Sequence, residues 1–162
     1  LLARRLCESG CGFITVSSPG WDMHGAHEFA ITDGMPVLGP AVDKAVSAFI
    51  EDIESRGLTE KVLLVITGEF GRTPKINTKG GRDHWGNLCP LVFVGGGLKM
   101  GQVIGESDKK GAEPITNPIT SNDLLGTIMH SLFDLGQVRT LANIPRDVQD
   151  VVGSGNPISE LI

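Results

Sequence analysis

Two short runs of apolar residues restrict the folds open to this chain of 162 residues more than any other feature. Residues 61–67, KVLLVIT, are almost continuously apolar and consist largely of Leu and β-branched side chains. Residues 89–97, CPLVFVGGG, form a second apolar run that ends in three glycines. Such runs are typical of central strands in a parallel sheet whose two faces are both covered. The sequence therefore predicts a layered domain with these two segments inside it.

Helical patterns separate and flank the apolar runs. Apolar residues recur at helical spacing in three segments, residues 2–6, 38–56 and 121–135. Thr120 is placed to cap the third helix, and Asp123 stands at the third position of a capping box. These features predict three helices, the last with a well-defined start.

The order of elements predicts the fold class. A further buried strand is expected at residues 13–16 and a short strand at residues 102–104, whereas the tail from Gln137 is expected to be mostly coil. Helices alternating with buried strands indicate an α/β domain with a mainly parallel sheet. No apolar run approaches the ~20 residues of a membrane span. The net charge of −5 argues against a nucleic-acid partner.

Polar residues gather in two loops, residues 18–31 and 68–88, and each loop follows a predicted strand. In open α/β sheets, ligands bind at the loops that leave the carboxyl ends of the strands. We therefore expect the two loops to face one crevice.

The two loops contain the residue types of a metal site. The first loop contributes Asp22 and His24, and the second contributes Glu69, Asp83 and His84. Mixed oxygen and nitrogen ligands suit Zn, Mn or Fe and are common in hydrolytic metal sites. If these side chains converge, they form a metal centre.

Two arginines of the second loop, Arg72 and Arg82, could bind the oxygens of a phosphate or sulfate ester in a forked geometry. The same residues could instead have purely structural roles. Asp22 also fits a cap or turn residue, and His24 fits a hydrogen-bonded structural histidine. Arg82 and Asp83 could make a loop salt bridge. The placement of both clusters after strands favours the functional reading.

Longer motifs indicate a family. The segments GWDMHG, GEFGRTPKIN, GGRDHWGN and VGGGLKMGQVIGESD occur in this order, and the chain ends in GNPISELI. This pattern resembles the sulfatase-like proteins called domain of unknown function 1501 over the whole chain. Members are usually much longer, and the chain starts in a helical segment without an initiator Met. We therefore expect residues 1–162 to be the C-terminal part of one sulfatase-like domain whose N-terminal half is absent.

That family is similar to the alkaline phosphatase superfamily, which implies an incomplete three-layer α/β/α sandwich and a divalent cofactor (zinc, manganese or calcium). The resemblance implies Asp22 and His24 as the first ligand pair, with His27 as an alternative to His24. It implies His84 as the lone histidine ligand. Glu69 stands where an aspartate ligand is expected, and Phe70 replaces a histidine, so the second metal position has lost a ligand.

Arg72, Arg82 and Asp83 are then expected near the substrate, with Asp83 as a supporting partner or a further ligand. The implied function is metal-dependent hydrolysis of a small anionic phosphate or sulfate ester. The nucleophile has no match here, so this chain alone is expected to be inactive. A degenerate member that binds an anionic ligand or glycan, or a metal-free structural domain, are the alternatives. An extracytoplasmic location, no membrane span, and self-association through an exposed sheet edge are also expected.

Overall fold

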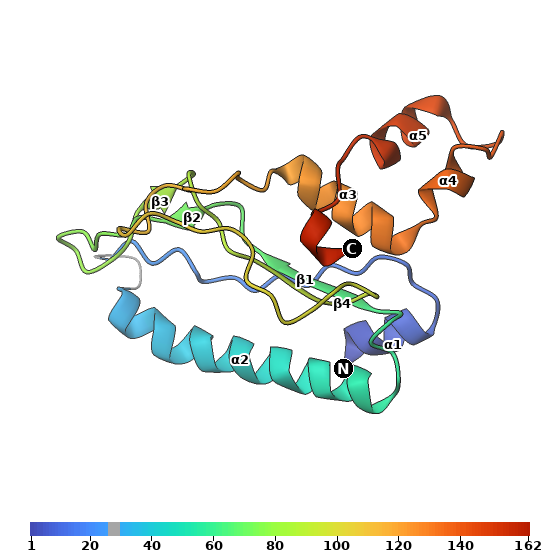
Figure 1. Cartoon of the computed structure of the whole chain (residues 1–162). Coiled ribbons are helices and arrows are strands. Elements are labelled where there is room, and N and C mark those ends of the chain that lie inside the picture. Colours follow the sequence, from blue (N-terminus) through green and yellow to red (C-terminus); the bar gives the residue numbers. More distant parts are fainter. Residues whose placement is uncertain (26–29) are drawn as a thin grey trace. The chain divides into compact units, whose positions relative to one another are not determined.

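The computed structural model describes residues 1–25 and 30–162, whose helices and strands are labelled in Figure 1. These residues divide into two compact units. Unit 1 comprises residues 1–58, 67–91 and 109–113, and unit 2 comprises residues 59–66, 92–108 and 114–162. Both polar loops belong to unit 1, so the candidate site can be described within that unit.

Unit 1 is built on two helices, α1 (Leu2–Glu8) and α2 (Ile31–Ser55). Arg4 of α1 is buried and donates a hydrogen bond from Nε to Oδ2 of Asp52 on α2, at 2.9 Å. It also pairs with Glu8 on its own helix. A buried guanidinium needs such partners, because an unpaired buried charge is strongly unfavourable. This ion-pair cluster therefore ties α1 to α2.

Helix α2 begins earlier than the predicted start at residue 38 and includes Pro36 and Pro40. Its first turns position the neighbouring loop. Met23 is buried, and a Cβ at Gly34 would lie only 2.8 Å from the Met23 sulfur. The absence of a side chain at Gly34 thus lets Met23 pack against α2. This contact anchors the residue between the two candidate ligands of the first loop.

Two very short strands lie inside the second loop, where no strand was predicted. Strand β2 (Gly71–Arg72) pairs antiparallel with β3 (His84–Trp85), with Gly71 opposite Trp85 and Arg72 opposite His84. Residues far apart in the loop are thereby brought side by side.

The two predicted apolar strands are β1 (Leu63–Thr67) and β4 (Leu91–Gly95), which pair with each other and belong to unit 2 except for Thr67 and Leu91. Helix α3 (Ser121–Leu132) starts as predicted, because Thr120 and Asp123 form a reciprocal capping box. The tail is less irregular than expected. It forms α4 (Leu135–Val138), α5 (Arg146–Gly153) and the 3₁₀ helix η1 (Ser159–Leu161).

The buried Thr127 of α3 connects the helix to this tail. Its hydroxyl donates to the Asp123 carbonyl at 2.7 Å and accepts the Ile158 amide at 2.9 Å. A side chain placed at Gly126 would collide with the backbone of Gly155. Close backbone packing therefore holds the end of the tail on α3.

The predicted fold class is wrong. Within the described residues there are two two-stranded sheets, and no mainly parallel sheet lies in a three-layer α/β/α sandwich. The segment at residues 13–16 forms no strand, and Phe13 and Val16 are 75% and 76% exposed. Residues 102–104 form no strand either. An apolar run predicts that a segment prefers a strand, but a sheet also needs partners with matching hydrogen bonds, and the run does not specify them.

Among the helices of the described residues, none combines the length and the apolar character that crossing a membrane requires.

Candidate metal centre

The two polar loops meet backbone to backbone in unit 1. Gly25 forms an antiparallel bridge with Gly80, and the Arg82 amide donates to the Met23 carbonyl at 3.0 Å. A Cβ at Gly25 would collide with the Lys79 carbonyl, and one at Gly81 would collide with the backbone of residue 24. Glycine permits this close approach because it has no side chain. The loops were predicted to face one crevice, and they do lie against each other, although by this bridge rather than at the edge of a parallel sheet.

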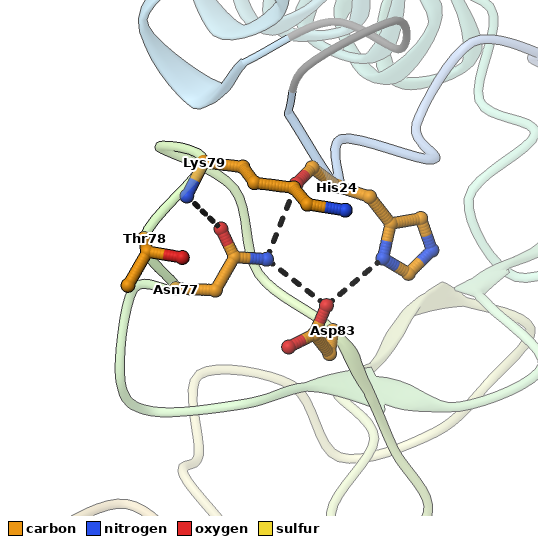
Figure 2. A pocket seen from close by; sticks show the side chains of 5 residues that line it. All are labelled: His24, Asn77, Thr78, Lys79 and Asp83. Carbon is orange, nitrogen blue, oxygen red and sulfur yellow. Dashed lines mark hydrogen bonds and ion pairs between the residues drawn. The ribbon is translucent and has the colours of Figure 1, made fainter.

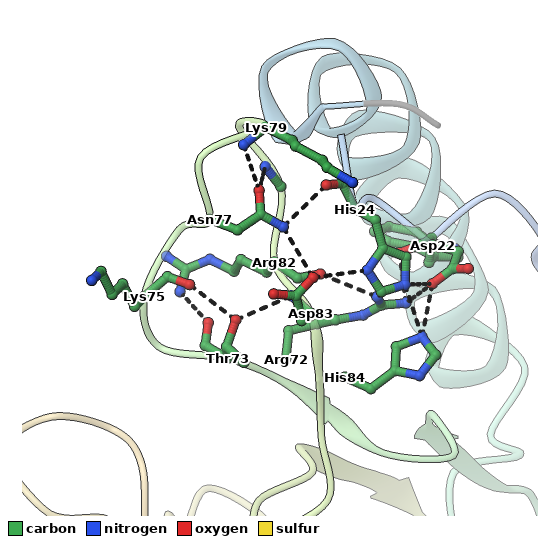
Figure 3. A network of polar contacts seen from close by, with 12 residues as sticks. Asp22, His24, Arg72, Thr73, Lys75, Asn77, Lys79, Arg82, Asp83 and His84 are labelled. Carbon is green, nitrogen blue, oxygen red and sulfur yellow. Dashed lines mark hydrogen bonds and ion pairs between the residues drawn. The ribbon is translucent and has the colours of Figure 1, made fainter. Parts of the chain in front are cut away.

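Three predicted ligands converge where the loops meet (Figure 3). The Nε2 atom of His24 lies 2.8 Å from Oδ1 of Asp22 and 3.0 Å from Nε2 of His84. The third side of this triangle, from His84 Nε2 to Asp22 Oδ1, is 3.1 Å. We call these residues the ligand triad.

The ligand triad fits a divalent metal by donor type and by spacing. Two imidazole nitrogens and one carboxylate oxygen are a common set for zinc and related ions. Bonds of 2.0–2.1 Å at tetrahedral angles separate ligand atoms by roughly 3.3 Å, slightly more than the three distances here. Small side-chain movements would open the triangle to that size. Asp22 and His84 are 58% and 52% exposed, so an ion can reach them from solvent.

A carboxylate sets the orientation of His24. Oδ1 of Asp83 lies 3.3 Å from Nδ1 of His24, and an ionised carboxylate can only accept a hydrogen bond. We therefore assign the proton of His24 to Nδ1, which leaves a lone pair on Nε2 toward the ligand triad. Metal-binding histidines commonly have a carboxylate partner of this kind.

Asn77 hydrogen-bonds to both His24 and Asp83 and so fixes their relative positions (Figure 2). Its side-chain NH₂ donates to Oδ1 of Asp83 at 3.0 Å and to the His24 carbonyl at 3.1 Å. Its side-chain oxygen accepts the amides of Lys79 and Gly81 at 2.9 and 3.0 Å. Both donors and both acceptor positions of the amide are used. The residue was not predicted as part of the site, although an Asn before a Gly-rich turn is a signal for such local bonding.

The three contacts within the ligand triad cannot all be hydrogen bonds, because too few of the three atoms carry a proton. With the His24 proton on Nδ1, neither His24 Nε2 nor Asp22 Oδ1 supplies a proton to the 2.8 Å contact between them. His84 can place at most one proton on its Nε2 atom. Two acceptors in contact repel each other unless a cation lies nearby. A positive charge beside His24 Nε2 and Asp22 Oδ1 would therefore stabilise their contact.

Arg72 supplies that charge in the structure. Its Nη2 donates to Asp22 Oδ1 at 2.6 Å, and its Nη1 donates to His24 Nε2 at 3.3 Å. Further bonds of 3.3 Å run to the backbone carbonyls of Trp21 and Arg82. A guanidinium thus satisfies two of the three atoms that a metal would use.

The electrostatics keep both carboxylates ionised. Hydrogen bonds from Arg72 and then from His84 lower the pKa of Asp22 to about 2. The pKa of Asp83 is also lowered, chiefly by its hydrogen bond with His24 and then by the bond from Asn77. At neutral pH both groups are therefore available as anions.

Phe70, which stands where the resemblance expects a histidine, packs against His84. The ring centroids are 4.2 Å apart at an interplanar angle of 40°, and the Arg72 guanidinium carbon lies 5.8 Å from the Phe70 centroid. The phenyl ring therefore packs beside both residues and restricts the orientation of the imidazole.

The remaining predicted residues take other places. Glu69 is exposed and is not a member of the one group of clustered metal-binding side chains found in the described residues. Arg82 binds the carbonyls of Thr73, at 2.7 Å, and Pro74, so it closes its own loop. The alternative ligand His27 lies outside the described residues.

An open pocket of about 390 Å³ adjoins the His24 side of the ligand triad (Figure 2). It is lined by five residues, His24, Asn77, Thr78, Lys79 and Asp83. Every lining residue has a polar side chain, and one of them, His24, is a member of the ligand triad. The pocket therefore offers room for a polar molecule beside the ligand triad.

The family model described as "Protein of unknown function (DUF1501)" matches residues 1–162. The chain belongs to the DUF1501 family. No match was found among curated proteins or among solved structures. Both loops of the candidate metal centre lie within the DUF1501 match, so the site is built from residues of the family region itself.

Proposed function

We propose that this DUF1501 chain holds a divalent metal through Asp22, His24 and His84, and that the site serves hydrolysis of phosphate or sulfate esters. The observation that carries the metal site is the ligand triad, whose three donor atoms lie within 3.1 Å of one another. The sulfatase-like motifs of the sequence support the hydrolytic role. When bound, the metal would act as a Lewis acid on an ester oxygen.

The chain's own residues have separate roles in this proposal. Asp22 and the two histidines bind the ion, and Asp83 keeps the His24 proton on Nδ1 so that Nε2 carries a lone pair. Arg72 lies beside the metal position with a planar set of donors that suits ester oxygens. The polar pocket next to His24 offers space for the substrate.

Calorimetric titration with zinc and manganese tests the metal site. We expect saturable binding by the chain, and we expect His84→Ala to weaken it more than the 10–100-fold typical of a supporting residue. Glu69→Ala should have a smaller effect, because Glu69 lies outside the ligand triad. His130→Ala is the matched control, because His130 is an exposed histidine of α3. Equal metal affinities of the wild type and His84→Ala would refute the metal site. The cluster around His84 would then only hold the two loops together by hydrogen bonds.

Turnover separates a hydrolase from a binding protein. The family resemblance matches no nucleophile to a residue of this sequence, so aryl phosphate and aryl sulfate hydrolysis should be measured on the full-length protein. Metal-dependent turnover that His84→Ala abolishes would support the hydrolase. Metal binding without turnover of either ester would instead favour a member that binds an anionic ligand.

A further inference from the structure

Arg72 and a divalent metal require the same atoms. The guanidinium donates to Asp22 Oδ1 at 2.6 Å and to His24 Nε2 at 3.3 Å. Both atoms belong to the ligand triad. The Nε2 atom of a neutral His24 has a single lone pair, so a metal bound there excludes the hydrogen bond from Arg72. Asp22 Oδ1 has a further lone pair, but a metal on it would bring two cations against each other and so disfavours the second hydrogen bond.

The backbone contacts of Arg72 do not compete with a metal. Its donations to the Trp21 and Arg82 carbonyls, each 3.3 Å long, involve no atom of the ligand triad. The strand pairing of Arg72 with His84 also fixes its Cα beside the site. If the guanidinium leaves Asp22 and His24, it stays close by, with N–H donors that need new acceptors.

The local charge becomes more positive when a metal enters. With both histidines neutral, Asp22 and Asp83 carry two negative charges, and Arg72 and the nearby Lys79 carry two positive charges. A divalent cation makes the sum positive, and it also frees the Arg72 donors. A planar guanidinium next to a metal is a favourable partner for a tetrahedral oxyanion, because it can donate two parallel hydrogen bonds.

We propose that Arg72 serves as the cation of the ligand triad when no metal is bound, that a divalent metal displaces it from His24 and Asp22, and that the released guanidinium then binds a phosphate or sulfate group. This inference rests on the proposed metal site, and it adds an order of events: metal first, oxyanion second. By linkage, the factor by which the metal tightens oxyanion binding equals the factor by which the oxyanion tightens metal binding.

The first consequence concerns metal affinity without an oxyanion. Arg72→Met removes the competing cation while keeping an unbranched side chain. The apparent Kd for a metal rises as the population of the competent state falls, so removal of the competitor should tighten manganese binding, on the order of tenfold. Arg5→Met is the matched control, since it removes the same charge from an exposed position on α1 of the same unit. It should leave the manganese affinity unchanged.

The second consequence needs no variant. Manganese should be titrated into the wild type in sodium sulfate and in sodium chloride of equal ionic strength. Sulfate should tighten manganese binding several-fold in the wild type and in Arg5→Met, and it should have no effect in Arg72→Met. Circular dichroism of each variant shows whether it has folded.

The manganese and sulfate titrations show separately whether the exchange of cations fails and whether the metal site itself fails. Weaker or equal manganese binding by folded Arg72→Met, or no effect of sulfate on the wild type, overturns the inference while the metal site stands. No manganese binding by either the wild type or Arg72→Met overturns both. Tighter binding by Arg72→Met together with loss of its sulfate response supports the exchange of cations.

Discussion

At the scale of single residues, the site depends on which atoms carry protons. His24 presents a lone pair to the ligand triad because Asp83 accepts its other ring proton at 3.3 Å. Asn77 in turn fixes Asp83, with a 3.0 Å hydrogen bond to the same carboxylate oxygen. An amide is suited to this place because it is a donor on one side and an acceptor on the other.

Asn77→Asp should separate these two functions of the amide. The new carboxylate still accepts the Lys79 and Gly81 amides, so the turn is retained. It cannot donate to Asp83, and two carboxylates would face each other. We expect metal affinity to fall by about 10–100-fold and the Nδ1-protonated form of His24 to become less populated. The ¹⁵N chemical shifts of the His24 ring in the metal-free protein measure the second effect.

The control for that variant is Asn117→Asp, which adds the same charge at an exposed position of unit 2. An unchanged His24 tautomer together with unchanged metal affinity in Asn77→Asp would show that Asn77 only shapes its loop.

At the scale of elements, α3 shows how a local motif sets a helix boundary. Oγ1 of Thr120 accepts the Asp123 amide at 3.3 Å, and the Asp123 carboxylate accepts the Thr120 amide at 2.7 Å. Hydrogen bonds from the Thr120 side chain and then its backbone lower the pKa of Asp123. Amides that would otherwise lack a partner at the helix start are thereby satisfied.

The capping box should make the stability of α3 depend on pH. Because the pKa of Asp123 is lower in the folded state, its contribution is present above the unfolded pKa of about 3.9. It is lost as the pH falls through the folded pKa. Asp123→Asn should therefore flatten the decline of unfolding free energy below about pH 4, as measured by urea denaturation followed by circular dichroism. A decline as steep as in the wild type would contradict this role.

Loss of the Thr120 hydroxyl tests the other half of the motif. Thr120→Ala should lower the free energy of unfolding by about 1 kcal/mol at neutral pH, which is typical for loss of an N-cap. Thr140→Ala is the control, because Thr140 is an exposed threonine of the same unit whose hydroxyl donates to a backbone carbonyl. Equal stabilities of the two variants would show that the cap contributes little.

At the scale of the whole molecule, the candidate metal centre belongs to one compact unit only. Asp22, His24, Arg72 and His84 all lie in unit 1, whereas α3, α4 and α5 lie in unit 2. A ligand that binds only the folded state stabilises it by about 2.7 kcal/mol at a free concentration of 100 Kd. This stabilisation acts on the cooperative region that contains the site. Self-association through an unpaired strand edge stays a prediction at this scale.

Hydrogen exchange with and without zinc should show this restriction. We expect zinc to slow amide exchange in residues 71–85, which contain β2 and β3, and to leave residues 121–132 of α3 unchanged. His84→Ala should lose the protection. Equal protection of both segments would mean that the two units open together, and protection of α3 alone would place the metal elsewhere.

Local patterns in the sequence were sufficient for several elements. The apolar runs predicted the strands β1 and β4, although not as members of a parallel sheet. The Thr120 and Asp123 pair predicted the start of α3. Residue type singled out Asp22, His24, Glu69 and His84 as candidate ligands, of which Asp22, His24 and His84 lie together. Burial preference, capping and ligand chemistry depend on side chains and near neighbours, so they can be read from short segments.

The tertiary structure decided which partners each segment has. It paired β1 with β4 and left residues 13–16 outside any sheet, which ruled out the predicted sandwich. It placed Arg72 rather than Arg82 at the ligand triad, and it brought the Asn77 side chain into hydrogen-bond contact with the His24 carbonyl. These choices depend on hydrogen bonds and on glycine-dependent backbone contacts between residues some 50 positions apart. Such contacts leave no periodic pattern along the chain, because they are determined by where the two loops meet in space.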